Sequence, residues 1–171
     1  MLVLFAFACR VPALAIQEAC TGSTVHAMWP DHSYSDIEAE LEALAAAGGR
    51  WARVDVAWPQ MEQPDGRLNP YHLARLEHVL DEASERGMNV QAILIQTPGR
   101  ANGGAGLWVP PDAEHEPDFA DFVSQIVSAY RGRIRYWQIW NEQNISEFWQ
   151  PSPDAARYTR LLKAAYEAAK A

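Results

Sequence analysis

The chain has 171 residues, of which 49% are apolar, and it carries a formal net charge of −8. This length and apolar fraction suit one folded domain with a substantial core and exclude a disordered chain. The negative charge argues against a nucleic-acid or anionic-membrane partner, because either would require a basic face; an acidic balance is otherwise typical of a soluble protein.

The first residues have some features of a signal peptide. An apolar run extends from Leu2 to Ala8, and Ala13-Leu14-Ala15 offers small residues suited to cleavage. No basic residue precedes the run, however, and Arg10 interrupts it. We predict that residues 1–22 are a leader or a degenerate signal peptide, which would indicate secretion. The alternative is a ragged start of the chain. No apolar stretch approaches the about 20 residues that a membrane span requires.

A first strand and helix are predicted over residues 24–47. Residues 24–29 favour a strand through their β-branched and aromatic side chains. Ser35 is a suitable N-cap for a helix from 36 to 47, with acidic residues in its first turn. Gly48 and Gly49 then end this helix.

A second unit combines a strand over residues 51–57 with a helix over 70–86. Pro70 suits the first turn of that helix, and Gly87 suits its end. The apolar positions of the helix follow the 3.6-residue period: Leu73, Leu76, Val79, Leu80 and Ala83.

The third and fourth units follow the same order. Residues 88–95 form an almost continuous apolar run, which is typical of a strand buried on both faces in a parallel sheet. A helix is predicted over 117–131, a strand over 134–140, and a last helix from 153 to the C-terminus. Apolar residues lie on one stripe of each helix: Phe119, Phe122, Val123, Ile126 and Val127, then Tyr158, Leu161, Leu162 and Ala165.

Strict alternation of strands and helices predicts a parallel sheet with right-handed crossovers. A doubly wound open sheet and a barrel both satisfy this order. A dinucleotide-binding fold needs a glycine-rich turn after its first strand, but residues 29–34 contain no glycine, and the chain has no Walker-type motif. Residues 102–106 are rich in glycine but lack a lysine, and we interpret them as a flexible loop. We therefore predict an α/β fold, the N-terminal half of a (β/α)₈ (TIM) barrel over residues 23–171, with four parallel strands.

The residues that end the predicted strands suit a carbohydrate site, because a barrel gathers its active site at the C-terminal ends of its strands. These ends carry His26, Asp55, Trp58 and the run Trp140-Asn141-Glu142. Aromatic rings stack on sugar rings, and amides and carboxylates hydrogen-bond sugar hydroxyls.

Glu142 is the strongest candidate for catalysis. Glycosidic cleavage needs a carboxylic acid that protonates the leaving oxygen and a second carboxylate on the other side of the sugar. The pKa of the acid must be raised, and the apolar residues Ile139 and Trp140 predict such surroundings for Glu142. Asn141 offers an amide that can donate to a sugar hydroxyl. The alternative is a carboxylate in an ordinary loop.

Two segments resemble the retaining (β/α)₈-barrel glycoside hydrolases, a superfamily that includes cellulase-, β-xylosidase- and β-galactosidase-like enzymes. Residues 53–66 (RVDVAWPQMEQPDG) resemble their second strand and loop. Residues 136–142 (YWQIWNE), followed by Asn144, resemble their fourth strand, where an Asn-Glu pair holds the acid/base. The resemblance covers roughly residues 22–171. It implies hydrolysis of a β-linked sugar by retaining double displacement, with Glu142 as acid/base.

The same resemblance implies that the nucleophile, a Glu at the end of a seventh strand, is missing from this chain. A complete barrel takes about 250 residues, so we expect a fragment that is inactive alone and self-associates through open half-barrel edges. A second hypothesis is a non-catalytic carbohydrate-binding or interaction module made from a half barrel. A third is an unrelated α/β enzyme, although the chain lacks a phosphate loop.

The remaining candidates each have a structural alternative. Arg53 is predicted either to support the carboxylates from inside the barrel or to form a salt bridge with an acid such as Asp55. His26 is predicted either to bind sugar or to be a hydrogen-bonded barrel histidine. Trp58 and Trp108 are candidates for sugar stacking or for loop packing. Asp55 and Glu62 are weaker catalytic candidates than Glu142.

No metal or cofactor is expected from the sequence. The histidines at positions 32, 72, 78 and 115 show no paired ligand spacing. Cys9 and Cys20 have no partners at useful spacing, so we interpret them as incidental. The expected ligand is a glycoside, an oligosaccharide or a polysaccharide.

Overall fold

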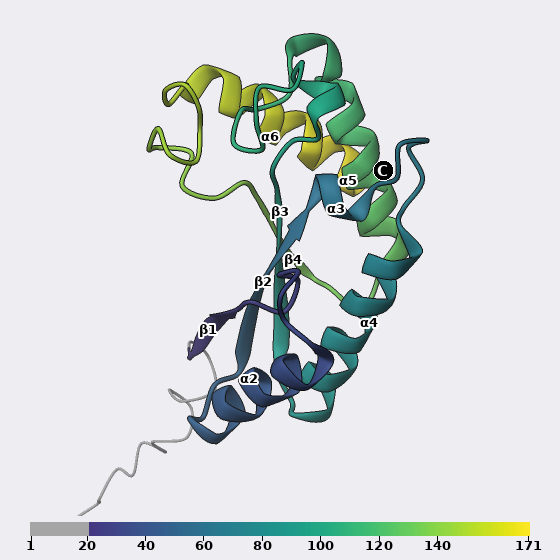
Figure 1. Ribbon diagram of the computed structural model, residues 1–171, viewed down its shortest axis with the longest axis vertical. Coiled ribbons are helices and arrows are strands. Elements are labelled where there is room, and N and C mark those ends of the chain that lie inside the picture. Colours follow the sequence, from purple (N-terminus) through teal and green to yellow (C-terminus); the bar gives the residue numbers. More distant parts are fainter. Residues whose placement is uncertain (1–20) are drawn as a thin grey trace, which may run out of the picture.

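The computed structural model describes residues 21–171 (Figure 1). The apolar N-terminal run, Cys9 and Cys20 lie outside these residues. No helix within the described part is both long and apolar enough to cross a membrane.

The centre of the fold is a sheet of four parallel strands in the order β1-β2-β3-β4. The strands are β1 (Gly22–Val25), β2 (Trp51–Ala57), β3 (Asn89–Ile95) and β4 (Tyr136–Ile139). Each strand therefore lies beside the next one in the sequence. A doubly wound sheet reverses its strand order at a switch point, whereas a barrel does not. The predicted parallel half-barrel arrangement is confirmed.

Four long helices follow the strands: α2 (Tyr34–Ala46), α4 (Pro70–Glu85), α5 (Glu116–Ala129) and α6 (Ala155–Lys170). Figure 1 shows α2, α4 and α5 along one side of the sheet. The predicted stripes on α4 and α5 are buried at their centres, through Leu76, Val79 and Leu80, and Phe119, Phe122, Val123 and Ile126. The short helix α3 (Trp58–Met61) and two 3₁₀ turns (Gly99–Ala101 and Ala113–His115) were not predicted.

The beginning of the chain differs from the prediction in two places. Strand β1 ends at Val25 rather than Trp29, because the chain turns there and the Trp29 amide donates to the His26 carbonyl at 3.0 Å. The N-cap of α2 is Ser33 rather than Ser35. Its hydroxyl accepts from the Asp36 amide at 3.2 Å, and the Asp36 carboxylate accepts from the Ser33 amide at 2.8 Å. This reciprocal capping box satisfies two helix-end donors.

The sheet has one apolar face and one mixed face. On β2, Ala52, Val54 and Val56 are fully buried, whereas the alternating Arg53 and Asp55 are only partly buried. Paired residues of parallel strands point the same way, so Arg53 shares a face with Gln91 and Tyr136, which are in register with it. This second face, called the inner face below, corresponds to the interior of a barrel and is lined here by polar and aromatic side chains.

Two sheet edges have no strand partner within the described residues. Strand β1 pairs only with β2, and β4 pairs only with β3. Beside β4, a cavity of about 380 Å³ lies between α5, β4 and α6. Two large apolar residues of α6 near it, Leu162 and Tyr166, are exposed.

Candidate functional site

The C-terminal ends of the four strands form one edge of the sheet, which we call the rim. At the rim, three residues other than glycine have left-handed backbone: Gln96 (φ 68°), Trp140 (φ 63°) and Glu142 (φ 52°). Such conformations are unfavourable for L-residues and cluster at functional sites when surrounding contacts enforce them. Trp140 is held in this way. Its amide donates to the Leu94 carbonyl at 2.8 Å, and its indole Nε1 donates to the Phe148 carbonyl at 2.6 Å.

Arg53 links β2 to the end of β4. Its Nη2 donates to Asn141 Oδ1 at 2.7 Å and to Gln138 Oε1 at 3.2 Å. The guanidinium therefore supports Asn141, the residue next to Glu142, from the inner face of the sheet, whereas the sequence interpretation was that it supports the carboxylates themselves. The proposed salt bridge to Asp55 is not among the ion pairs of the described residues.

The same contacts orient the amide of Asn141. Its Oδ1 accepts from Arg53 and, at 3.4 Å, from Gln138 Nε2. A guanidinium only donates hydrogen bonds, so the oxygen of the amide must face Arg53 and the Nδ2 group must face away from it. This orientation leaves the Asn141 NH₂ group as a donor to a ligand. Gln138, which the sequence reasoning missed, thus helps to position this amide.

Glu142 lies at the rim, as expected, but its surroundings differ from the prediction. The residue is exposed, although the neighbouring Trp140 is fully buried. Both residues have left-handed backbone, but their side chains lie in different surroundings. The Trp140 ring lies in the core, where it packs edge-to-face on Trp149 with ring centroids 5.2 Å apart. The expected apolar enclosure of Glu142 is therefore not provided by the described residues.

Asp55 is a second carboxyl on the inner face. Burial raises its pKa above the usual value, and the nearby Arg53, His26 and Trp29 only partly oppose this effect. A half-buried carboxyl with a raised pKa is typical of functional sites, although ion-pair networks also produce such shifts.

His26 and Trp29 form an aromatic corner after β1. Their rings meet edge-to-face at 4.3 Å, and Trp29 is 46% exposed. His26 is held by Glu40 of α2, whose carboxylate accepts from the His26 amide at 2.9 Å and lies 3.3 Å from its Nδ1. The histidine is thus hydrogen-bonded within the fold while remaining partly open at the rim.

Arg75 of α4 fixes the loop that carries this corner. This arginine is only 4% exposed. Its Nε donates to the Ala27 carbonyl at 2.6 Å, and its Nη2 donates to the carbonyls of Trp29 and His32 at 3.1 and 2.6 Å. These bonds satisfy loop carbonyls that have no strand partner. The amphipathic pattern of α4 gave no signal for a buried cation.

Three other candidates make contacts outside the Arg53–Asn141 group. Trp58 is fully buried and packs on Phe119 and Phe122 with ring centroids 5.4 and 5.9 Å apart, so its ring is core rather than a stacking surface. Glu62 is ion-paired with Arg100, and its side chain is only 5% exposed. Trp108 is partly buried and packs edge-to-face on Phe148, in the loop after β4, at 4.7 Å.

Within the described residues, no set of three metal-ligating side chains forms at the rim. One such set forms elsewhere, between α2 and α4, and consists of Glu38, His78 and Glu82. The sequence alone did not indicate this group, because Glu38 lies on a different helix from the other two.

No model of a known protein family matches this sequence. Solved structures nevertheless share its fold. A family 39 glycoside hydrolase from the gut symbiont Bacteroides cellulosilyticus WH2 is 24% identical with a TM-score of 0.64, covering 87% of this chain and 28% of that chain. A GH5_18 protein from Streptomyces cattleya in complex with Manβ1-4GlcNAc is 18% identical with a TM-score of 0.66. The match covers 88% of the present chain and 41% of the Streptomyces chain. A family 1 β-glucosidase from Thermotoga maritima is 19% identical with a TM-score of 0.60. The match covers 80% of the present chain and 33% of the Thermotoga chain.

These neighbours are glycoside hydrolases of the β/α-barrel clan, and this chain spans between 28% and 41% of their lengths. The resemblance to barrel glycoside hydrolases that the sequence indicated is therefore confirmed at the level of the fold. The chain has the fold of half of such a barrel.

Proposed function

We propose that this chain carries the acid/base half of a retaining β-glycoside hydrolase active site, with Glu142 as the acid/base. In that reaction the Glu142 carboxyl protonates the leaving oxygen while a second carboxylate attacks the anomeric carbon and forms a glycosyl-enzyme. The Glu142 carboxylate then takes a proton from water, and the resulting hydroxide displaces the enzyme carboxylate from the sugar.

The observation that carries this proposal is the arrangement at the end of β4. Asn141 presents an oriented NH₂ group, because Arg53 and Gln138 hold its oxygen. Glu142 follows directly, in a left-handed backbone conformation at the rim. This arrangement offers an amide donor for a sugar hydroxyl beside a carboxyl that can protonate the leaving oxygen, which is one of the two carboxyl roles in glycoside cleavage.

Sugar stacking in this proposal belongs to Trp29 and Trp108 rather than Trp58. Trp29 is exposed at the rim beside His26, whereas Trp58 lies in the core. We propose that His26 and Trp29 together contact the sugar, and that Trp108 extends the binding surface from the loop after β3. A glycoside, an oligosaccharide or a polysaccharide is the proposed ligand.

Two requirements of the reaction are not met by the described strands alone. The acid of such a reaction works in surroundings that exclude water, and Glu142 is exposed among the described residues. A retaining enzyme also needs a carboxylate about 5–5.5 Å from the acid. The resemblance places that nucleophile on a seventh strand, beyond β1–β4. We therefore propose that turnover needs a carboxylate from outside these strands.

The role of Glu142 is testable in a version of the chain extended to eight strands with the second half of a barrel glycosidase. Replacing Glu142 with Ala removes the proton donor, which poor leaving groups need and good leaving groups do not. The expected loss in kcat/KM is about 10²–10⁴-fold for alkyl β-glycosides and far smaller for dinitrophenyl β-glycosides.

Glu147→Ala is the matched control, because Glu147 is an exposed glutamate in the same loop. It should leave both substrate classes within about twofold of the parent, as is usual for surface substitutions. An equal loss on both leaving-group classes in Glu142→Ala would contradict the acid role.

A second candidate function is sugar binding without turnover. The observation that favours it is the polar inner face, on which Arg53 and Gln91 each donate a hydrogen bond to Gln138 Oε1. Calorimetric binding of an oligosaccharide by the chain, combined with no hydrolysis by the extended version, would support this candidate over the first.

A further inference from the structure

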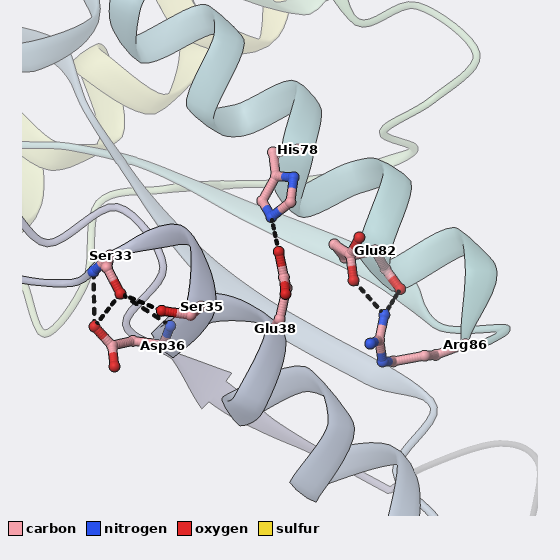
Figure 2. A network of polar contacts seen from close by, with 7 residues as sticks. All are labelled: Ser33, Ser35, Asp36, Glu38, His78, Glu82 and Arg86. Carbon is pink, nitrogen blue, oxygen red and sulfur yellow. Dashed lines mark hydrogen bonds and ion pairs between the residues drawn. The ribbon is translucent and has the colours of Figure 1, made fainter.

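A cluster of metal-ligating side chains lies on the helical layer, away from the rim. Glu38 comes from α2, whereas His78 and Glu82 lie one helical turn apart on α4. One ligand atom from each residue lies within 4.8 Å of the other two. Figure 2 shows the Glu38 carboxylate reaching across to the His78 ring, with Glu82 farther along the same helix.

We infer that Glu38, His78 and Glu82 form a binding site for a divalent transition-metal ion of the zinc type. Zinc binds imidazole nitrogen and carboxylate oxygen at about 2.0–2.2 Å, so the edges of a tetrahedral site measure about 3.3–3.5 Å. The distance between His78 Nε2 and Glu38 Oε1 is 3.3 Å. This edge therefore already has a length that a bound zinc ion requires, and the Glu82 ligand atom lies within 4.8 Å of both atoms.

The nitrogen that faces the carboxylates lacks a hydrogen-bond partner. His78 Nε2 is buried from solvent and makes no hydrogen bond of acceptable geometry, although Glu38 is close to it. The Glu38 carboxylate is its ion-pair partner, and a metal ion between the two would give this buried nitrogen the directed bond that it lacks. The ring is also fixed, because Tyr34 packs edge-to-face on it with centroids 4.6 Å apart.

A second layer of contacts orients the third ligand. Arg86 Nη1 donates to Glu82 Oε2 at 2.6 Å, and Arg86 Nε donates to Glu42 Oε2 at 3.1 Å. Ligating carboxylates in metal sites are usually hydrogen-bonded by such neighbours, which leave the other oxygen for the metal. Glu82 can thus keep its bond to Arg86 and bind through Oε1.

The ligand set determines the class of ion. One imidazole and two carboxylates suit zinc and its neighbours, whereas calcium and magnesium prefer oxygen ligands alone. Three protein ligands leave a fourth position for water, and the site is partly exposed, so an ion can enter from solvent. Binding would join α2 to α4 and would not involve the rim.

Isothermal titration with zinc chloride tests this inference. The protein is the full chain with Cys9 and Cys20 replaced by Ser, because thiols bind zinc themselves. We expect one zinc per chain, with magnesium much weaker. His78→Ala and Glu38→Gln should each weaken zinc binding by at least about tenfold, since each removes a ligand.

Glu85→Gln is the matched control, because it removes a carboxylate from an exposed position of α4 outside the cluster. It should bind zinc like the parent. If His78→Ala fails to fold, Glu38→Gln decides the question, since Glu38 is partly exposed on a helix surface. Unchanged zinc affinity in Glu38→Gln, zinc binding no tighter than magnesium binding, or no binding at all would overturn the inference.

Discussion

At the scale of single residues, Asp55 links the site to the stability of the fold. Burial raises its pKa in the folded chain. The folded chain therefore holds this proton more tightly than the unfolded chain, and the contribution is fully present below the usual value of 3.8. That contribution is lost as the pH rises through the raised folded pKa. The Asp55→Asn variant cannot ionise at this position. As the pH rises from about 4 to about 7, the free energy of unfolding of this variant should therefore fall less than that of the parent chain.

Urea unfolding at the two pH values measures this difference. Asp121→Asn is the control, since Asp121 is exposed on α5 and should retain the pH dependence of the parent. Identical pH dependence in Asp55→Asn and the parent would show that burial does not shift the Asp55 pKa.

The two tryptophans Trp58 and Trp29 show what the sequence left open at the scale of residues. Trp29 ends one predicted strand and Trp58 follows another, and the sequence pattern alone does not distinguish the surroundings of the two side chains. The difference arises because Trp58 opens the short helix α3 and turns into the core beside Phe119 and Phe122, whereas Arg75 holds the loop of Trp29 at the surface. Both causes depend on residues distant in the sequence.

At the scale of elements, the unpaired edge at β4 predicts self-association of the isolated chain with a second copy. The side of α6 next to β4 exposes Leu162 and Tyr166 around the cavity beside that strand. Open strand edges and apolar patches both favour association. Sedimentation velocity should therefore show oligomers that increase with concentration.

Tyr166→Glu should shift this equilibrium toward the monomer, because it places a charge on the exposed apolar side of α6. Tyr71→Glu provides the matched control: Tyr71 is 64% exposed and Tyr166 is 61% exposed, but Tyr71 lies on α4, away from the open edge. A parent chain that is monomeric at every concentration would contradict the prediction.

At the scale of the whole molecule, the order of the elements was predictable because local signals repeat in each unit. Strand β2 was predicted with its observed bounds, and Pro70 and Gly87 bracket α4 as expected. The site was predictable only in part. Glu142 and Asn141 were proposed from the end of the fourth strand and Arg53 from within the second, but the bond between Arg53 and Asn141 spans 88 positions in the sequence. The trio of Glu38, His78 and Glu82 was missed because two helices must pack before its members meet.

We propose above that this chain supplies one of the two carboxylates of a glycosidase. The most direct test compares hydrolysis of a panel of aryl β-glycosides by the purified chain and by the version extended to eight strands. We expect turnover by the extended protein only, because Glu142 then faces a nucleophile. Turnover by the chain alone would contradict this expectation, and would point to a nucleophile from Asp55 or from a second copy.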